Sequence, residues 1–175
     1  MTADITVRRL GADDYPRYID ALCELLAGCI AGGASLGFMA PVEHSALLAF
    51  WDHIFEQVAH DERVLLIAED AEGHALGTVQ IVTAQPANQG HRADVSKLLV
   101  HPDARRRGIA TSLMAAADVA AVDCGKSLLV LDTATGSVAE GMYTRLGWQL
   151  CGVIPDYSRL PDGTLCGTTF FFKTV

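Results

Sequence analysis

The first third of the chain carries the hydrophobic patterns of one strand and two helices. Apolar and polar residues alternate over Ile5–Arg9, which is typical of a strand with one buried face. Apolar residues then recur at helical spacing over Tyr15–Ile30 and over Val42–His60. One carboxylate of the Asp13-Asp14 pair is placed to cap the first helix, and the Gly32-Gly33 pair ends it.

The rest of the chain predicts two further helices and most of the strands. A turn-rich segment at 69–74 separates two apolar runs and indicates a β-hairpin, and Ser137-x-x-Glu140 is a capping box that begins a short helix. The expected strands are 64–68, 76–82, 93–100, 127–131, 148–153 and 168–173, and the expected helices are 107–123 and 137–146. The order βααβββαβαββ predicts one α/β domain over residues 1–175. We expect a mixed, mostly antiparallel sheet of about seven strands with helices on both faces.

Composition and charge exclude several classes of function. The formal net charge of −8 argues against a nucleic-acid-binding protein, which needs a broad basic surface. Five cysteines without a Cys-x-x-Cys pair indicate neither a disulfide framework nor a zinc site. His53-x-x-Glu56 has no evident third ligand, so we expect no metal. Without a secretory signal or a membrane-length apolar run, we expect a cytoplasmic protein that does not act at a membrane.

The strand at 93–100 leads through a proline turn into a basic turn and then a helix. Arg105, Arg106 and Arg107 precede Gly108, and the start of the following helix offers backbone N–H groups without helical partners. Gly108 lets the backbone approach an anion closely. The pattern Arg-x-x-Gly-x-Ala is therefore a candidate pyrophosphate cradle. It lacks the Gly-Lys-Ser/Thr of a Walker A loop and the glycine spacing of a dinucleotide site.

Three motifs follow one another along the chain: Val100-His101-Pro102, the Arg105–Ala110 turn and the segment Met142–Trp148. Together they resemble the signature of the GCN5-related N-acetyltransferase (GNAT) family. The Gly32–Ala40 segment and Leu131-Asp132-Thr133 further resemble the tabtoxin-resistance acetyltransferase branch of that family. The resemblance implies the GNAT fold and acetyl-CoA as co-substrate. It also implies an acyltransferase that moves an acetyl group directly to the primary amine of a small molecule, such as a toxin, an antibiotic or an amino-acid derivative.

The resemblance also assigns residues to the co-substrate. Backbone groups of the strand before the basic turn would hold the pantetheine arm and polarise the thioester carbonyl, and the turn would hold the pyrophosphate. The expected contacts are Leu98, Leu99, Val100, Arg105, Arg106, Arg107, Gly108, Ile109, Ala110, Thr111, Ala139 and Tyr143.

Two carboxylates and one tyrosine are the candidate catalytic residues. Asp94 occupies a strand position where several family members carry an acidic general base, and strand alternation points it the same way as Leu98 and Val100. Asp132 ends the neighbouring strand, so both carboxylates could converge on one amine, directly or through a water. Tyr143 matches the family tyrosine proposed to protonate the departing thiolate, and simple packing is the alternative.

Several alternatives stay open at this point. A protein N-terminal or lysine acetyltransferase would need an open peptide groove in place of a walled pocket. A non-catalytic acyl-CoA-binding sensor would keep the cradle without needing Asp94 or Tyr143. Family members often carry an asparagine seven residues before this tyrosine, where the chain has Gly136. The sequence is compatible with a monomer or a homodimer. Gly33-x-Ser35-x-Gly37 matches a hydrolase pattern but follows a predicted helix instead of a strand.

Overall fold

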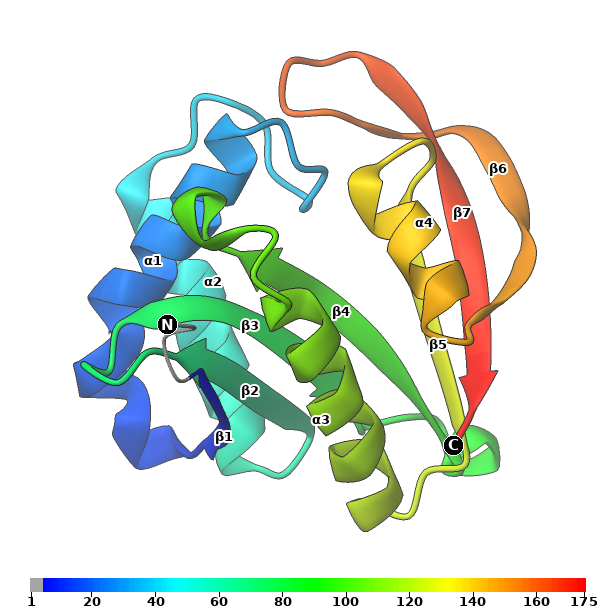
Figure 1. The fold of residues 1–175 in the computed structure, drawn as a ribbon, viewed down its shortest axis with the longest axis horizontal. Helices are drawn as coiled ribbons and strands as arrows, with labels where there is room; N and C mark the ends of the chain where they lie inside the picture. Colours follow the sequence, from blue (N-terminus) through cyan, green and yellow to red (C-terminus); the bar gives the residue numbers. More distant parts are fainter. Residues whose placement is uncertain (1–4) are drawn as a thin grey trace.

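All strands of the computed structural model, which describes residues 5–175, lie in one open sheet (Figure 1). Its order is β1-β2-β3-β4-β5-β7-β6. Neighbouring strands are antiparallel except β4 and β5, which are parallel. The strands are β1 (Thr6–Leu10), β2 (Arg63–Glu69), β3 (Ala75–Val82), β4 (Arg92–Val100), β5 (Leu128–Ala134), β6 (Gln149–Arg159) and β7 (Leu165–Thr174). The predicted mixed, mostly antiparallel sheet and its element order are confirmed.

Helices cover both faces of this sheet, as expected. The first pair, α1 (Tyr15–Ala31) and α2 (His44–Ala59), lies on one face, and the second pair, α3 (Ile109–Asp123) and α4 (Val138–Arg145), lies on the other (Figure 1). Short 3₁₀ turns connect them: η1 (Ala12–Asp14), η2 (Ala87–Gln89) and η3 (Pro102–Ala104). None of the helices within residues 5–175 is both long and apolar enough to cross a membrane.

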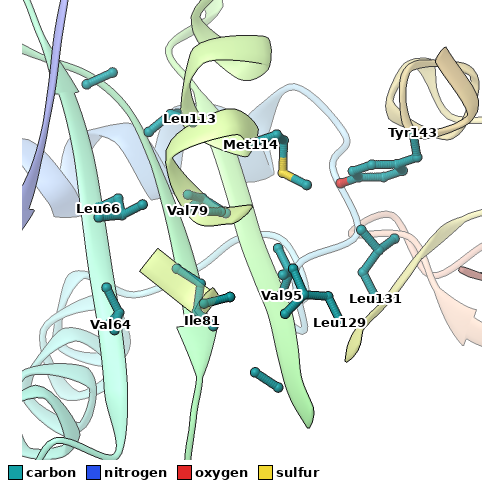
Figure 2. Close-up of a cluster of buried hydrophobic side chains, with 14 of the residues drawn as sticks. Val64, Leu66, Val79, Ile81, Val95, Leu113, Met114, Leu129, Leu131 and Tyr143 are labelled. Atoms are coloured by element: carbon teal, nitrogen blue, oxygen red, sulfur yellow. The ribbon is translucent and has the colours of Figure 1, made fainter. Parts of the chain in front are cut away.

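The central strands are apolar on both faces because each face is covered by helices. In β2, Val64 and Leu66 belong to the hydrophobic cluster beneath α3, whereas Leu65 and Ile67 belong to the cluster beneath α1 and α2. This division follows the two-residue period of a strand. Figure 2 shows the α3-side cluster, which continues across β3, β4 and β5 to Tyr143 of α4.

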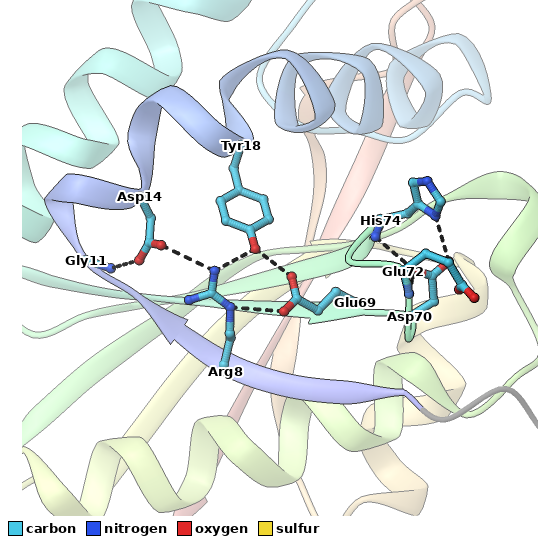
Figure 3. Close-up of polar contacts among 8 residues, drawn as sticks. All are labelled: Arg8, Gly11, Asp14, Tyr18, Glu69, Asp70, Glu72 and His74. Carbon is cyan, nitrogen blue, oxygen red and sulfur yellow. Dashed lines mark hydrogen bonds and ion pairs between the residues drawn. The ribbon is translucent and has the colours of Figure 1, made fainter.

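A polar network ties the N-terminal strand to α1 (Figure 3). The Arg8 guanidinium donates to Asp14 at 3.3 Å, to the Tyr18 hydroxyl at 2.6 Å and to Glu69 at 3.1 Å. Asp14 also accepts a hydrogen bond from the Gly11 N–H at 2.9 Å. The expected side-chain cap of α1 is therefore absent at Asp14, because this carboxylate bonds the preceding turn and Arg8 instead.

The predicted hairpin of β2 and β3 is confirmed, and polar groups close its turn. Asp70 accepts hydrogen bonds from the backbone N–H of His74 at 2.8 Å and of Glu72 at 3.1 Å (Figure 3). The His74 N–H is the main cause that holds the pKa of Asp70 below its usual range.

The two C-terminal strands are longer than predicted. The sequence pattern gave 148–153 and 168–173, whereas β6 spans Gln149–Arg159 and β7 spans Leu165–Thr174. β6 is an edge strand whose residues are mostly exposed, and its pairing with β7 is irregular between Ile154 and Ser158. The extent of β6 is set by its backbone hydrogen bonds with β7. These bonds impose no pattern of hydrophobic residues, so the sequence does not show where the strand ends.

Candidate active site

β4 and β5 are paired at one end only. Their parallel register joins Arg92–Asp94 to Leu128–Val130. Beyond Asp94 and Val130 the two strands diverge, as Figure 1 shows. We call the unpaired region between their C-terminal halves, residues 95–100 and 131–134, the opening.

A β-bulge interrupts β4 beside this opening. Between Ser96 and Leu99, two residues of β4 lie opposite one residue of β3. The first of the two is Lys97, whose φ of 51° lies in the left-handed region. A bulge of this kind leaves a main-chain amide outside the ladder, where it is available to a ligand.

The bulge corrects the expected direction of Asp94. Ala93 and Val95 are buried beneath α3, so Asp94 between them points to the opposite face, toward the side of α1 and α2. Leu98 and Val100 pack against the same α3-side cluster as Ala93 and Val95, because the extra residue shifts the alternation by one. The prediction that Asp94 shares a face with Leu98 and Val100 is therefore wrong.

The structure places the two candidate carboxylates on the same face but in different surroundings. The Asp94 carboxylate accepts hydrogen bonds from Gln85 Nε2 and Arg92 Nη1, both at 2.7 Å. Asp132 lies two residues beyond Val130, the register partner of Asp94, at the open end of the strands. Asp132 lines a pocket there, and Asp94 is not among the lining residues.

This pocket has a volume of about 400 Å³ and lies on the α1/α2 side of the opening. One wall is the segment 35–39 between α1 and α2, and another is formed by residues 157–159 of β6 with Thr168 of β7. Figure 1 shows the α1–α2 connection and the β6–β7 turn at the same end of the molecule as the diverging strands. Lys97, Asp132 and Arg159 bring charge to the lining.

Lys97 is a pocket residue that none of the sequence motifs indicated. Its Nζ lies 6.0 Å from the ring centroid of Phe50 in α2. Burial lowers the pKa of Lys97, and the Asp132 carboxylate acts in the opposite direction. The available signal was a lysine at the centre of a central strand, directly before the apolar residues 98–100, where a charged side chain needs a reason.

The residues predicted to form the cradle lie at the start of α3. Gly108 directly precedes the helix with φ of 81°, and Arg106 also has a positive φ of 60°. The N–H of Ser112 bonds the carbonyl of Gly108 at 3.0 Å, so the N–H groups of Ile109, Ala110 and Thr111 have no acceptor within the helix. Arg106, Arg107 and Gly108 are exposed, as a surface that binds an anion requires.

Arg105 differs from its two neighbours because it lies against α1. Its guanidinium is close to the buried thiol of Cys29, where it partly opposes the burial that raises the pKa of Cys29. Its Nη2 is also 3.7 Å from the position that a Cβ on Gly32 would occupy. A cation at this end of α1 complements the negative end of the helix dipole.

Tyr143 is buried in α4 with only 6% of its surface exposed. Its ring packs against Trp148 and Phe171, with centroid distances of 6.1 and 5.8 Å. Figure 2 shows its hydroxyl pointing toward Met114 of α3. Burial raises the pKa of Tyr143 to about 12, and the Asp132 charge adds to the effect. The phenol is thus a protonated group between α3 and α4, facing the opening.

The start of α4 follows the predicted capping pattern with one difference. Ser137 Oγ accepts a hydrogen bond from the Glu140 N–H at 3.3 Å. The Glu140 carboxylate accepts from the Gly136 N–H at 2.5 Å, one residue before the position that a standard capping box uses. Ala139 is partly buried against the α3-side cluster.

The family is decided by a match over most of the chain. A model of the acetyltransferase (GNAT) family matches residues 19–148. The chain belongs to the GNAT acetyltransferase family. It is therefore an acyltransferase, and the predicted GNAT fold is confirmed.

Solved structures share this fold along nearly the whole chain. An acetyltransferase from Acinetobacter baylyi is 18% identical with a TM-score of 0.84, covering 100% of this chain and 95% of its own. A phosphinothricin acetyltransferase from Sinorhizobium meliloti, in complex with acetyl-CoA, is 18% identical with a TM-score of 0.80 and coverages of 100% and 89%. A ribosomal-protein-alanine N-acetyltransferase from Brucella melitensis is 20% identical with a TM-score of 0.78 and coverages of 97% and 99%. At these identities the likeness establishes the fold.

Proposed function

We propose that this chain, as a single domain, transfers the acetyl group of acetyl-CoA directly to the primary amine of a small molecule. One observation carries the proposal. The pocket that contains Asp132 lies on one face of the sheet, and the cradle and Tyr143 lie on the other. The opening lies between them, where β4 and β5 have no register pairs. An acceptor and an acyl donor bound on opposite sides would meet in this opening.

The residues on the α3 side fit acetyl-CoA. The exposed start of α3, with Arg106 and Arg107 beside it, suits a pyrophosphate. The edge of β4 at Leu98–Val100 has no β5 partner, so its backbone is free for the amides of a pantetheine arm. The neighbour from S. meliloti was solved with acetyl-CoA, which agrees with this assignment.

The roles of the side chains follow from aminolysis of a thioester. Asp132 accepts a proton from the acceptor ammonium, directly or through a water, and the freed amine attacks the carbonyl carbon. The amide left unpaired by the bulge at Lys97 donates to the carbonyl oxygen as negative charge develops there. Tyr143 donates its proton to the thiolate as the carbon–sulfur bond breaks, and the second proton that the attacking nitrogen loses restores the phenol through water. Asp94 is bonded to Arg92 and Gln85 outside the pocket, so as a base it would act through water.

The pocket favours a small acceptor over a peptide. Its volume of about 400 Å³ suits a metabolite-sized molecule, and the 35–39 segment and the β6–β7 strands wall it on two sides. A protein N-terminal acetyltransferase, as in the ribosomal-protein-alanine relative, is the alternative acceptor class. A non-catalytic acyl-CoA sensor is the alternative without chemistry. The narrower assignment to the tabtoxin-resistance branch and a cytoplasmic location stay predictions.

An acceptor panel tests the proposal. The purified chain is incubated with acetyl-CoA and, separately, with small primary amines, with short peptides and with no acceptor, and release of the coenzyme A thiol is followed. Thiol release and acetylated product with small amines are expected. Turnover with peptides but not with small amines would show that the acceptor is a peptide instead of a small molecule. Saturable acetyl-CoA binding without turnover on any amine would favour the sensor.

A further inference from the structure

The acceptor pocket contains an ammonium that no other group neutralises. Lys97 lines the pocket, yet within residues 5–175 its Nζ makes no hydrogen bond and no ion pair. Phe50 lies below it at 6.0 Å, and a Cβ on Gly37 would be 4.0 Å from it. Removing an ammonium from water without a partner is unfavourable, and a bound anion offsets this cost.

The opposite charge in the pocket comes from Asp132, whose side chain is exposed to solvent. The Asp132 carboxylate lines the same cavity and, in the described part of the chain, it too makes no hydrogen bond or ion pair. Lys97 and Asp132 influence one another electrostatically but do not form a salt bridge. The two groups therefore present separate binding points of opposite sign to one ligand.

The backbone fixes this separation. Lys97 is the bulge residue of β4 and has φ of 51°, and Asp132 is on β5 beyond the last paired residue. Because the strands diverge there, the two side chains reach the pocket from opposite sides of the opening. The remaining cation, Arg159, donates to the Gly163 carbonyl at 2.8 Å within its own hairpin. Lys97 is thus the uncommitted cation of the pocket lining.

Building on the proposed function, we propose that the acceptor is a zwitterion whose ammonium binds at Asp132 and whose acid group binds Lys97. The acid group is a carboxylate or another oxyanion, since both accept charge-assisted hydrogen bonds from an ammonium. Lys97 is then a specificity-determining residue that selects an acid-bearing amine. A peptide N-terminus lacks an acid group close to its amine, so the same pair disfavours peptides.

Matched acceptors provide the test. The wild-type chain is assayed at saturating acetyl-CoA with α-, β- and γ-amino acids, with their carboxamides and with aminoalkyl phosphonates. Acid-bearing acceptors are expected to have kcat/KM about 10- to 100-fold higher than their carboxamides, as a charge-assisted hydrogen bond provides. The phosphonates distinguish a carboxylate-specific site from one for oxyanions in general.

Variants of Lys97 separate specificity from other roles. Lys97→Met is expected to raise KM for acids about 10-fold or more, so that the ratio of kcat/KM between acids and their carboxamides falls by a similar factor. Lys97→Arg, which keeps the charge, should restore most of the preference. Arg9→Met is the matched control, because Arg9 is half exposed on β1 and pairs with Asp61 away from the pocket. KM for acetyl-CoA and the thermal midpoint report whether each variant is folded.

Each outcome decides the inference separately from the proposed function. Turnover of amines without preference for the acid overturns the zwitterion and leaves the acetyltransferase. An equal loss of kcat on acids and carboxamides in Lys97→Met also overturns it, because Lys97 would then act on every amine alike. No turnover of any small amine would refute the proposed function and, with it, the inference.

Discussion

Asp94 of β4 and Val130 of β5 are the last aligned pair of the two strands, and the candidate active site begins directly beyond them. The end of the pairing leaves the edge of β4 beyond Asp94 without a β5 partner, and it places Asp132, but not Asp94, in the pocket lining. The surrounding sheet stays continuous because β7 pairs with the full length of β5 on its other side.

Asp132→Asn is expected to lower kcat about 10²-fold or more, because a pocket carboxylate that accepts a proton is replaced by a neutral amide. Asp94→Asn is the matched comparison. Its carboxylate is held by Gln85 and Arg92 outside the pocket, so we expect less than about a 10-fold loss. Initial rates with a good amine, measured beside unfolding curves of both variants, check this. A larger loss for Asp94→Asn would assign the base to Asp94.

Gly108→Ala is expected to raise KM for acetyl-CoA and to destabilise the chain by about 1 kcal/mol, because φ at this position is 81°. Gly125→Ala controls for the strain. It lies at the other end of α3 with φ of 71° and open space around it, so its destabilisation should be similar without a change in KM. Urea titrations and acetyl-CoA saturation curves measure the two effects. Equal KM changes in both variants would argue against an anion site at the start of α3.

Tyr143→Phe is expected to lower kcat and to change the alkaline stability of the chain. The pKa of Tyr143 is raised to about 12, mainly by burial, so the fold favours the neutral phenol. Its contribution is complete below the unfolded pKa of about 10 and is lost as pH rises toward 12. At pH 11 the wild type should have lost about 1 kcal/mol that Tyr143→Phe does not lose.

The wild type and Tyr143→Phe are compared by urea unfolding at pH 8 and pH 11. Titration of every other group changes the free energy of unfolding of both proteins alike, so it cancels in the difference between them. Parallel losses in both proteins would mean that Tyr143 titrates normally. Unchanged kcat in Tyr143→Phe would leave the tyrosine with the packing role that its contacts with Trp148 and Phe171 already provide.

Arg8→Met is expected to lower the free energy of unfolding by about 1–3 kcal/mol, because the Glu69 carboxylate, 12% exposed, loses its charged partner. Arg9→Met, one residue along the same strand, should cost less than about 0.5 kcal/mol, since its partner Asp61 is 90% exposed. Denaturant unfolding at neutral pH measures both. A small effect of Arg8→Met would show that Tyr18 alone satisfies Glu69.

Sequence patterns predicted the fold well where elements bury one face or two. The helix Tyr15–Ala31 and the strands flanking the 69–74 turn exclude water from one face or both. Their apolar residues therefore recur with the period of the element, which the sequence shows directly. The start of the helix at Gly108 was also predictable, because the glycine and the arginines are consecutive and the turn depends on local backbone geometry. β6 was underestimated because an exposed edge strand needs no hydrophobic pattern.

The direction of Asp94 and the role of Lys97 were not predictable from the same patterns. Alternation along β4 fails at one inserted residue, and whether a strand contains a bulge depends on its register with β3. One slipped residue exchanges the faces of all residues beyond it. Lys97 thereby reaches the pocket, while Leu98 and Val100 turn toward α3.

By itself, the sequence determined the order of elements, the basic glycine turn before α3 and the family signature, because these depend on residues close together in the chain. Only the tertiary structure decided which charged groups share the pocket beside the opening. Asp132 and Lys97 are on different strands, and the bulge and the divergence that bring them to one cavity arise from pairing with β3 and β7. Such long-range pairing leaves no periodic pattern in either segment, so the sequence alone does not show that Lys97 and Asp132 line one pocket.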